Sequence, residues 1–269
     1  MRIVKLNTEI TMPIVCCGTN TYGKENDRYD GAIDGDTTEL DRAIAMGYRH
    51  FDTAISYRNE SVIGAAVKKS GIPREEFFIT SKIPGRPEYT STEEAVHQAV
   101  ASSLKALDTS YIDLYLIHHP WENLAEMLAV WNILETYVDK GVLKAIGVSN
   151  FNKEQLGYLL EHARIKPAVN QVESHPGNWN DEIIAYCKEN LVIPQAWGPL
   201  SRIDSHAKRV LAKIAQHHDK GWAQIVLRYQ IERRVVVIPK SHNEVRQRAN
   251  IQIFDFQLTE EEKAEIAKL

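Results

Sequence analysis

Eight short apolar runs recur along the chain with helix-like stretches after them, and this alternation limits the possible fold more than any other feature. The strand-like runs cover residues 14–17, 49–52, 77–81, 112–117, 143–148, 168–172, 191–196 and 235–238. The helix-like stretches cover residues 36–46, 60–70, 91–107, 123–139, 152–162, 180–190 and 206–218, and a C-terminal pair near 243–250 and 259–268. Eight such units predict an α/β protein of the (β/α)8 TIM barrel type.

A doubly wound parallel sheet is the competing arrangement. That fold usually carries the pattern G-x-G-x-x-G after its first strand, and the sequence GTNTYGKEND after residue 17 lacks it. The alternating N-terminal residues, with Asn7-Thr8 between two short runs, predict a β-hairpin that closes the bottom of the barrel. Because no repeat, low-complexity tract or linker interrupts the pattern, we expect residues 1–269 to form a single domain.

Local signals at the element boundaries support this division. Ser91-Thr-Glu-Glu and Thr259-Glu-Glu-Glu resemble capping boxes that begin helices. Gly71-Ile-Pro73 and Lys140-Gly141 are typical of positions where a helix ends before the next strand.

Composition excludes several classes of protein. A net charge of −4 gives no basic surface for nucleic acid. No apolar stretch approaches the roughly 20 residues that span a bilayer, and the N-terminus lacks the apolar core of a signal peptide. The odd set of Cys16, Cys17 and Cys187 favours the cytoplasm; the adjacent pair is interpreted as buried strand residues in preference to a redox sensor. No heptad pattern demands association, so we expect a monomer.

Polar side chains stand where three neighbouring strands should end. Asp52 closes RHFD, Lys82 closes FFITSK and His118 closes IDLYLIH, while Tyr57 lies in the loop after the first of these runs. Taken singly, they could be a helix cap, a solvated rim lysine and a core histidine. Parallel β/α folds keep their chemistry at the carboxyl ends of strands, however, and the barrel places these ends side by side.

The four side chains together suit proton transfer. Asp52 and Lys82 can pair, which makes both burials tolerable. An ammonium beside Tyr57 is predicted to lower the pKa of the phenol from about 10 toward working pH, which would make it a general acid for a carbonyl oxygen. His118 could orient the same oxygen. Because such a site supplies no electrons, it requires a hydride donor, which implies a nicotinamide cofactor.

Six stretches, which follow one another along the chain in the family's order, resemble the aldo-keto reductase family, in particular its bacterial 2,5-diketo-D-gluconate reductase-like branch. They are GYRHFDTAISYRNE (47–60), FFITSKIP (77–84), IDLYLIHHP (112–120), AIGVSNF (145–151), PAVNQVESHP (167–176) and VVVIPKS (235–241). The resemblance implies a (β/α)8 barrel that binds NADP(H) across its carboxyl-terminal face. It also implies a catalytic tetrad of Asp52, Tyr57, Lys82 and His118.

The resemblance further implies a set of cofactor contacts. The nicotinamide carboxamide would meet Ser149, Asn150 and Gln171, and Trp197 would stack on the ring. Lys240, Ser241 and Arg246 would hold the 2′-phosphate, and Asn250 would contact adenine, where Ala249 replaces a usual glutamate. Without the family, these are helix caps, a core aromatic and a basic rim. The full predicted set is Gly18, Thr19, Asp52, Ser149, Asn150, Gln171, Trp197, Gly198, Leu200, Lys240, Ser241, Arg246 and Asn250.

Departures from the family lie at the substrate end. His119 replaces a common tryptophan, and Asn20 replaces a frequent aromatic residue, so Asn20, Tyr57, His118 and His119 are the predicted substrate contacts. The segment after Trp197 turns quickly into helix, and the chain ends at Leu269 without a long tail. Together these features predict an open, polar and permissive pocket.

The expected function is therefore NADPH-dependent reduction of aldehydes or ketones, such as keto-sugars and α-dicarbonyls, with Tyr57 as general acid. One alternative is a metal-dependent barrel hydrolase built on His50, Asp52, His118, His119 and His175. Lys82 argues against it, because an ammonium would repel a divalent cation, so no metal is expected. The other alternative is a cofactor-binding sensor or scaffold, which the intact tetrad disfavours.

Overall fold

The computed structural model describes residues 2–269 and contains an eight-stranded parallel sheet closed into a barrel. Its strands neighbour one another in chain order from β3 to β10. The parallel bridge between Val15 and Val237 joins the first strand region to the last, and Cys16 N donates to Val237 O at 2.8 Å. The strands are β3 (Cys17–Gly18), β4 (His50–Asp52), β5 (Phe78–Ile83), β6 (Ile112–Ile117), β7 (Leu143–Ser149), β8 (Val169–Glu173), β9 (Ile193–Trp197) and β10 (Val236–Ile238). The predicted (β/α)8 barrel is confirmed.

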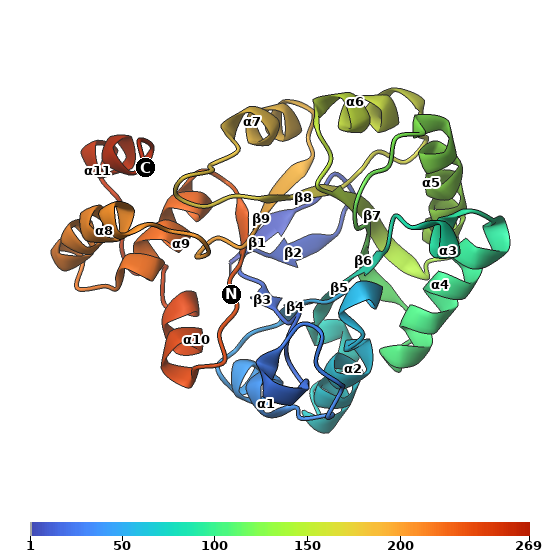
Figure 1. Cartoon of the computed structure of the whole chain (residues 1–269), viewed down its shortest axis with the longest axis horizontal. Helices are drawn as coiled ribbons and strands as arrows, with labels where there is room; N and C mark the ends of the chain where they lie inside the picture. The colour runs from blue at the N-terminus through green and yellow to red at the C-terminus, as the bar shows by residue number, and fades with distance from the viewer. Residues whose placement is uncertain (1) are drawn as a thin grey trace.

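Helices surround the barrel as an outer ring (Figure 1). They are α1 (Thr38–Ala45), α2 (Glu60–Lys69), α3 (Pro87–Thr90), α4 (Glu93–Ala106), α5 (Leu124–Asp139), α6 (Lys153–His162), α7 (Asp181–Glu189), α8 (Ser205–His217), α9 (Trp222–Glu232), α10 (Glu244–Ile251) and α11 (Glu260–Ile266). All but α3 and α9 were predicted from the sequence. In α9 every residue from 224 to 231 is buried, including Arg228 and Gln230, so its polar side chains do not mark a solvent face.

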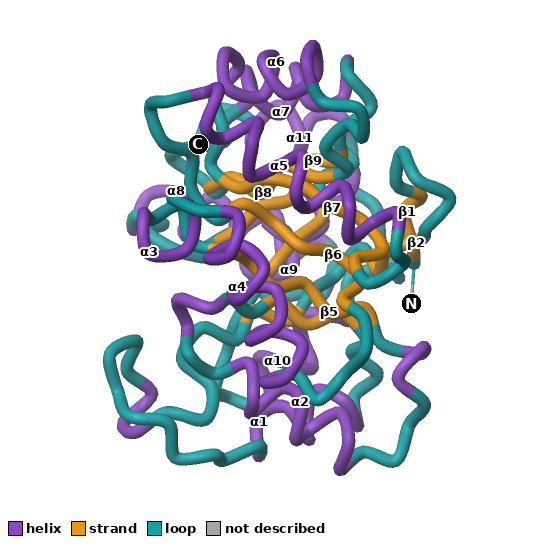
Figure 2. The backbone as a smooth tube through the Cα atoms, turned by 90° about the vertical axis from the view of Figure 1, so that its right-hand side faces the viewer, coloured by secondary structure: helices purple, strands orange, loops and turns teal. Residues whose placement is uncertain are grey.

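The N-terminal hairpin closes one end of the barrel, as predicted. Strand β1 (Ile3–Lys5) pairs antiparallel with β2 (Thr11–Pro13), with Ile3 opposite Pro13. Leu6 and Met12 are buried in a cluster with residues near the amino ends of the barrel strands, which are Phe78, Leu114, Ala145, Val169 and Val236. Figure 2 shows the hairpin at one end of the orange barrel strands. The opposite, carboxyl-terminal end is therefore the open one.

One predicted capping box is present and the other is absent, because the helix cap lies one residue later than predicted. Thr259 accepts a hydrogen bond from Glu262 N at 3.2 Å, and Glu262 returns one by accepting from Thr259 N at 2.9 Å. At the start of α4, the cap is Thr92, which accepts from Ala95 N at 3.1 Å, and no capping box forms. Ser91 has helical backbone angles because it ends the short helix α3, so the extended cap position falls one residue later.

The cysteines behave as buried apolar residues. Cys16, Cys17 and Cys187 are free and buried. Burial raises the pKa of the Cys17 thiol to about 12, which leaves little reactive thiolate at neutral pH. Among residues 2–269, no helix combines the length and apolar character needed to span a bilayer.

Candidate active site

Three neighbouring strand ends bring the four predicted catalytic side chains together at the open end of the barrel. Asp52 ends β4, Lys82 lies one residue before the end of β5, and His118 directly follows β6. Tyr57 comes from one turn of 3₁₀ helix (Ile55–Tyr57) in the loop after β4. The turn places its phenol next to Lys82, with the ammonium nitrogen 4.8 Å from the ring centre.

Asp52 and Lys82 form a buried ion pair with few unsatisfied atoms. Lys82 Nζ lies 2.5 Å from Asp52 Oδ1 and also donates to Thr53 O at 2.9 Å. The second carboxylate oxygen of Asp52 accepts from Gln171 Nε2 at 2.8 Å. Burial disfavours the charged ammonium, but Asp52 and Tyr57 outweigh that cost and raise the pKa of Lys82. Lys82 is therefore charged at neutral pH, and the hydrogen bonds of the pair compensate the burial.

Tyr57 keeps its proton more firmly than the sequence predicted. Its hydroxyl accepts from Lys82 Nζ at 3.4 Å. Burial raises the pKa of Tyr57 above its ordinary value, and the opposing effect of Lys82 does not overcome it. The predicted lowering of the Tyr57 pKa is thus wrong in direction, because the loss of hydration outweighs an ammonium that Asp52 already neutralises. Tyr57 is a protonated hydrogen-bond donor at neutral pH.

His118 is a neutral partner for Tyr57. The two rings meet edge to face with centroids 5.5 Å apart. Burial, together with the positive charge of Lys82, lowers the pKa of His118 to about 2. Its Nδ1 is buried and has no hydrogen-bond partner among the described residues. A neutral imidazole beside the phenol can donate one hydrogen bond to an oxygen without adding charge.

Asn150 connects the histidines to Trp197. Its side-chain nitrogen lies 3.1 Å from His119 Nδ1 and donates to His118 O at 3.1 Å, while its oxygen accepts from Trp197 Nε1 at 2.8 Å. Because the amide nitrogen is a donor, His119 Nδ1 must be the acceptor, which fixes its neutral tautomer. The rings of His118 and His119 are stacked with centroids 4.5 Å apart. His119 is therefore part of an ordered network.

A cavity of about 420 Å³ opens beside the tetrad. It is lined by fourteen of the predicted site residues, namely Gly18, Thr19, Asn20, Asp52, Tyr57, His118, His119, Ser149, Asn150, Gln171, Trp197, Gly198, Leu200 and Lys240. Pro199, Ser201, Ile238 and Pro239 line it as well and were not predicted. Ser201 and the prolines belong to short loops whose inward direction no local pattern reveals.

Besides Lys82, three predicted cofactor residues lie outside this lining, around the start and along the length of α10. Ser241 precedes the helix, Arg246 is exposed in its first turns, and Asn250 is buried in its last turn. The segment after Trp197 is short, as predicted, because α8 begins at Ser205. Its first residues, from Gly198 to Ser201, line the cavity.

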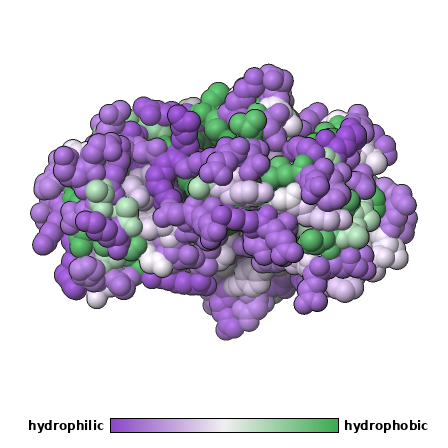
Figure 3. Space-filling view, turned by 90° about the horizontal axis from the view of Figure 1, so that it is seen from above, coloured by the Kyte–Doolittle hydropathy of each residue, from purple (hydrophilic) through white to green (hydrophobic). Residues whose placement is uncertain are grey.

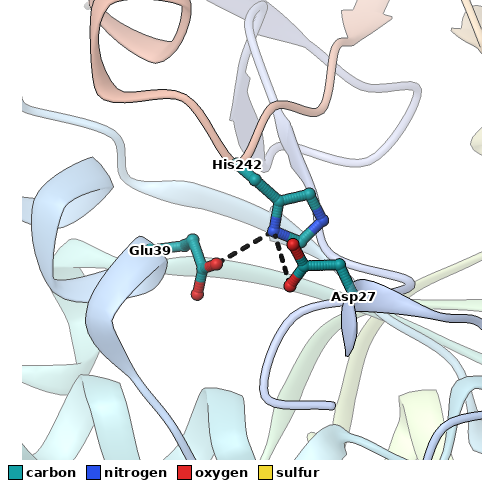
Figure 4. Close-up of side chains that lie close together, drawn as sticks. All are labelled: Asp27, Glu39 and His242. Atoms are coloured by element: carbon teal, nitrogen blue, oxygen red, sulfur yellow. Dashed lines mark hydrogen bonds and ion pairs between the residues drawn. The ribbon is translucent and has the colours of Figure 1, made fainter. Parts of the chain in front are cut away.

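His242, which the sequence did not single out, fastens the segment before α10 to the loop after β3. Figure 4 shows its imidazole between two carboxylates, with Nδ1 2.9 Å from Glu39 Oε1 and 3.2 Å from Asp27 Oδ1. Its Nε2 lies 2.7 Å from Thr21 Oγ1, which also accepts from Lys240 Nζ at 2.8 Å. Among residues 2–269, the one grouping with metal-ligand spacing consists of Asp27, Glu39 and His242, and none of these belongs to the tetrad.

His50, which the metal-site alternative used, is a buried structural residue. Its ring nitrogens lie 3.0 Å from Pro13 O and 3.0 Å from Thr80 Oγ1. Burial lowers the pKa of His50 to about 4. Both nitrogens thus have protein partners, and the ring serves packing beneath the tetrad.

The low pKa values of His50 and His118 predict that stability falls in mild acid. In the unfolded chain both histidines have a pKa near 6.5. Below that pH the unfolded state therefore binds more protons than the folded state, in which both histidines stay neutral. The free energy of unfolding therefore has its full value above pH 6.5. As the pH falls below 6.5, it decreases by about 1.4 kcal/mol per pH unit for each histidine, until about pH 4 for His50. Urea unfolding of the protein and of His50→Gln between pH 7 and 5 measures this; identical slopes would contradict the assignment.

The barrel and its site define a proton-donating centre: a tyrosine that holds its proton, a buried ion pair and a neutral histidine at the carboxyl ends of parallel strands. Comparison with known proteins gives the family. The Aldo/keto reductase family model matches residues 14–269. The chain is therefore a member of the aldo/keto reductase family, whose members are NADP-dependent oxidoreductases that act on carbonyl compounds.

Individual relatives cover most of the chain. Glyoxal reductase of Bacillus subtilis (strain 168) is 40% identical over 266 residues, which are 99% of this chain and 92% of that protein. Methylglyoxal reductase DkgA of Yersinia pestis is 36% identical over 236 residues, covering 84% of this chain and 83% of that protein. A crystal structure of a Bombyx mori aldo-keto reductase in complex with NADP superposes with a TM-score of 0.87 at 35% identity, covering 98% of this chain and 91% of that one. The predicted family, fold and cofactor class are confirmed.

Proposed function

We propose that this protein is a cytoplasmic, monomeric NADPH-dependent reductase of small aldehydes and ketones, with residues 1–269 acting as one domain. The observation that carries this proposal is the contact between the hydroxyl of a protonated Tyr57 and Lys82 Nζ at 3.4 Å, where Lys82 Nζ is itself paired with Asp52 Oδ1 at 2.5 Å. Such a site can give a proton to a carbonyl oxygen and stabilise the charge that develops there.

The cavity suits NADP(H). A Cβ on Gly18 would come 3.2 Å from Ile238 Cγ2 and 3.5 Å from Lys240 Cβ. A side chain at this position would therefore crowd two residues that line the cavity. Asn20 Oδ1 and His118 Nδ1 are buried polar atoms without partners among the described residues. Ser149, Asn150 and Gln171 would hold the carboxamide and Trp197 would pack on the ring, while Lys240, Ser241 and Arg246 would meet the 2′-phosphate, with Asn250 near the adenine.

When bound, the nicotinamide supplies the hydride that the chain itself cannot provide. The residues of the chain do the rest. Tyr57 donates its proton to the carbonyl oxygen, and His118 donates a hydrogen bond that orients that oxygen. Lys82 stabilises the phenolate that remains, and Asp52 keeps Lys82 charged and in place.

The substrate end favours small polar carbonyls. Asn20 and His119 supply hydrogen-bonding groups where the sequence predicted a polar wall, and both line the cavity. The glyoxal and methylglyoxal reductases among the relatives act on small dicarbonyls by name. α-Dicarbonyls, and keto-sugars of similar polarity, are therefore the proposed substrates.

Consumption of NADPH across α-dicarbonyls, keto-sugars, aromatic aldehydes and steroid ketones tests this function. The expected result is turnover with the first two groups, unchanged by a chelator. A bound metal ion together with no consumption of NADPH would favour the metal-dependent hydrolase class, and tight NADPH binding without turnover on any carbonyl would favour a sensor.

The preference for NADPH over NADH should depend on Lys240 and Arg246. The double variant Lys240→Ala/Arg246→Ala removes two cations near the expected 2′-phosphate, so the KM for NADPH should rise by about tenfold or more. The KM for NADH, which lacks that phosphate, should change much less. Steady-state kinetics with both cofactors measure the ratio, and an equal change for the two would remove these residues from the phosphate site.

The one face of the molecule that Figure 3 shows agrees with a monomer. The face in Figure 3 is mostly hydrophilic, and its hydrophobic residues form small separate patches. Light scattering at several protein concentrations tests the monomer directly, and a stable dimer mass would overturn it.

A further inference from the structure

A second cavity, of about 290 Å³, adjoins the first at the catalytic histidine. His118 and His119 line both cavities. The other residues around the second one are Tyr29, Ser56, Pro84, Gly85 and Arg86. A molecule whose carbonyl oxygen lies at Tyr57 and His118 can therefore extend into this space, away from the residues assigned to the cofactor.

Arg86 is the one cation among the residues that line this second cavity. Its present partners are weak, because Nη2 lies 3.3 Å from Ser56 Oγ and Nη1 lies 3.3 Å from Glu88 Oε1. The side chains of Arg86 and Glu88 are 58% and 55% exposed, so water screens that pair strongly. The guanidinium thus retains donors that can meet a better acceptor.

The backbone around Arg86 is held rigidly against the catalytic strand end. Prolines at positions 84 and 87 flank the Gly85-Arg86 pair, and a side chain on Gly85 would collide with the carbonyl oxygen of His119. Arg86 O accepts from Tyr89 N at 2.9 Å and from Thr90 Oγ1 at 3.0 Å. The backbone position of Arg86 relative to His118 is therefore set before any ligand arrives, so only its side chain has to be ordered on binding.

An aromatic wall faces this loop from another part of the chain. Tyr29 packs edge to face on Tyr57, with ring centroids 5.9 Å apart, and its hydroxyl donates to Ser56 O at 3.3 Å. Lys24 and Arg58 donate to the carbonyl oxygen of Tyr29 at 2.7 Å and 3.1 Å. The wall is thus anchored, and Tyr29 lines the cavity in which a short carbon chain would lie.

We propose that Arg86 binds a carboxylate of the substrate, so that the preferred substrates are small oxo-acids carrying an aldehyde or ketone a few carbons from the acid group. This inference rests on the proposed reductase function and deepens it. A guanidinium presents paired donors that match a carboxylate, and its positive charge adds to the binding. The charge of Arg86 reaches the catalytic centre, since after burial and Lys82 it also contributes to the lowered pKa of His119.

The test compares an aldehyde acid with its neutral counterpart. We would measure kcat/KM for succinic semialdehyde and for butanal with NADPH, in the parent protein, Arg86→Met and Arg86→Lys. The expected result is that Arg86→Met lowers the acid-to-neutral ratio of kcat/KM by about tenfold, a value that allows for solvent screening. Arg86→Lys keeps the positive charge but lacks the paired donors of the guanidinium. Its acid-to-neutral ratio should therefore lie between those of Arg86→Met and the parent protein.

Arg209→Met is the matched control, because Arg209 is an exposed arginine on α8 and its loss changes the net charge equally. The ratio should stay at the parent value in this control. A ratio that falls equally in both variants would reduce the effect to general charge and overturn the proposal, as would an unchanged ratio in Arg86→Met.

A binding measurement separates failure of this inference from failure of the reductase function. Calorimetric titration with succinate, which cannot be reduced at a carbonyl, reports the carboxylate site without turnover. The dissociation constant should rise about tenfold in Arg86→Met. If no carbonyl is reduced but this rise is seen, the function fails and the anion site stands; if carbonyls are reduced and the constant does not change, only the anion site fails.

Discussion

The Tyr57→Phe variant is expected to bind NADPH as tightly as the parent protein and to reduce carbonyls roughly 10²- to 10⁴-fold more slowly. The change removes one oxygen, which accepts from Lys82 Nζ at 3.4 Å and is the proton donor of the proposed reaction. The ring remains and still packs on His118, with centroids 5.5 Å apart in the parent. Fluorescence titration with NADPH and single-turnover kinetics measure the two properties separately.

Tyr158→Phe is a suitable control for this experiment. Tyr158 is stacked on His162 in α6, and neither residue lines the active-site cavity. This variant should keep both cofactor binding and turnover. Parent-like turnover in Tyr57→Phe would remove Tyr57 from its role, and a matching loss of NADPH affinity would mean that the substitution disturbs the fold of the site.

The Asp52→Ala variant is expected to lose about 3–5 kcal/mol of unfolding free energy. Lys82 is fully buried, and its ammonium has Asp52 Oδ1 as its charged partner at 2.5 Å. Without that carboxylate the low-dielectric interior holds an uncompensated charge, and Gln171 Nε2 loses one of its two acceptors, the one at 2.8 Å. Equilibrium urea unfolding followed by fluorescence measures the loss.

Two further variants serve as controls for that loss of unfolding free energy. Glu9→Ala breaks the Lys5–Glu9 pair, which is 2.6 Å long but whose side chains are 60% and 92% exposed, and should leave the unfolding free energy unchanged. The double variant Asp52→Ala/Lys82→Met removes both charges and should recover a large part of the stability. If Asp52→Ala unfolds at the urea concentration of the parent, the buried pair does not stabilise the barrel in the way described.

The grouping of the proposed catalytic residues could be predicted from the sequence because its information is local. Asp52, Lys82 and His118 each end an apolar run, and parallel topology brings such ends to one edge of the sheet. Most of the predicted cofactor residues line the cavity for the same reason, since strand ends and their short loops face it. Helix α9 was missed because its polar residues are buried, and the cap at Thr92 was missed because Ser91 already ends α3.

Tertiary structure alone decided the electrostatics. The sequence placed an ammonium beside Tyr57, but the direction of the Tyr57 pKa shift depends on how much hydration the phenol loses, which no local pattern states. The same limit applies to Arg86 and His242. Arg86 and Ser56 are 30 residues apart, and His242 and Glu39 are 203 residues apart, so each pair forms only once the barrel closes.

By itself the sequence determined the alternation that forms the barrel, the hairpin that closes its lower end and the residue types gathered at the upper end. These features follow from periodicity and from chain-neighbour topology, which are properties of short segments. The protonation of Tyr57, the shape of the cavity beside Arg86 and the fastening of the segment before α10 were decided only by folding. Each depends on burial and on contacts between distant segments, because hydration and Coulomb energies are set by the whole surroundings of a group.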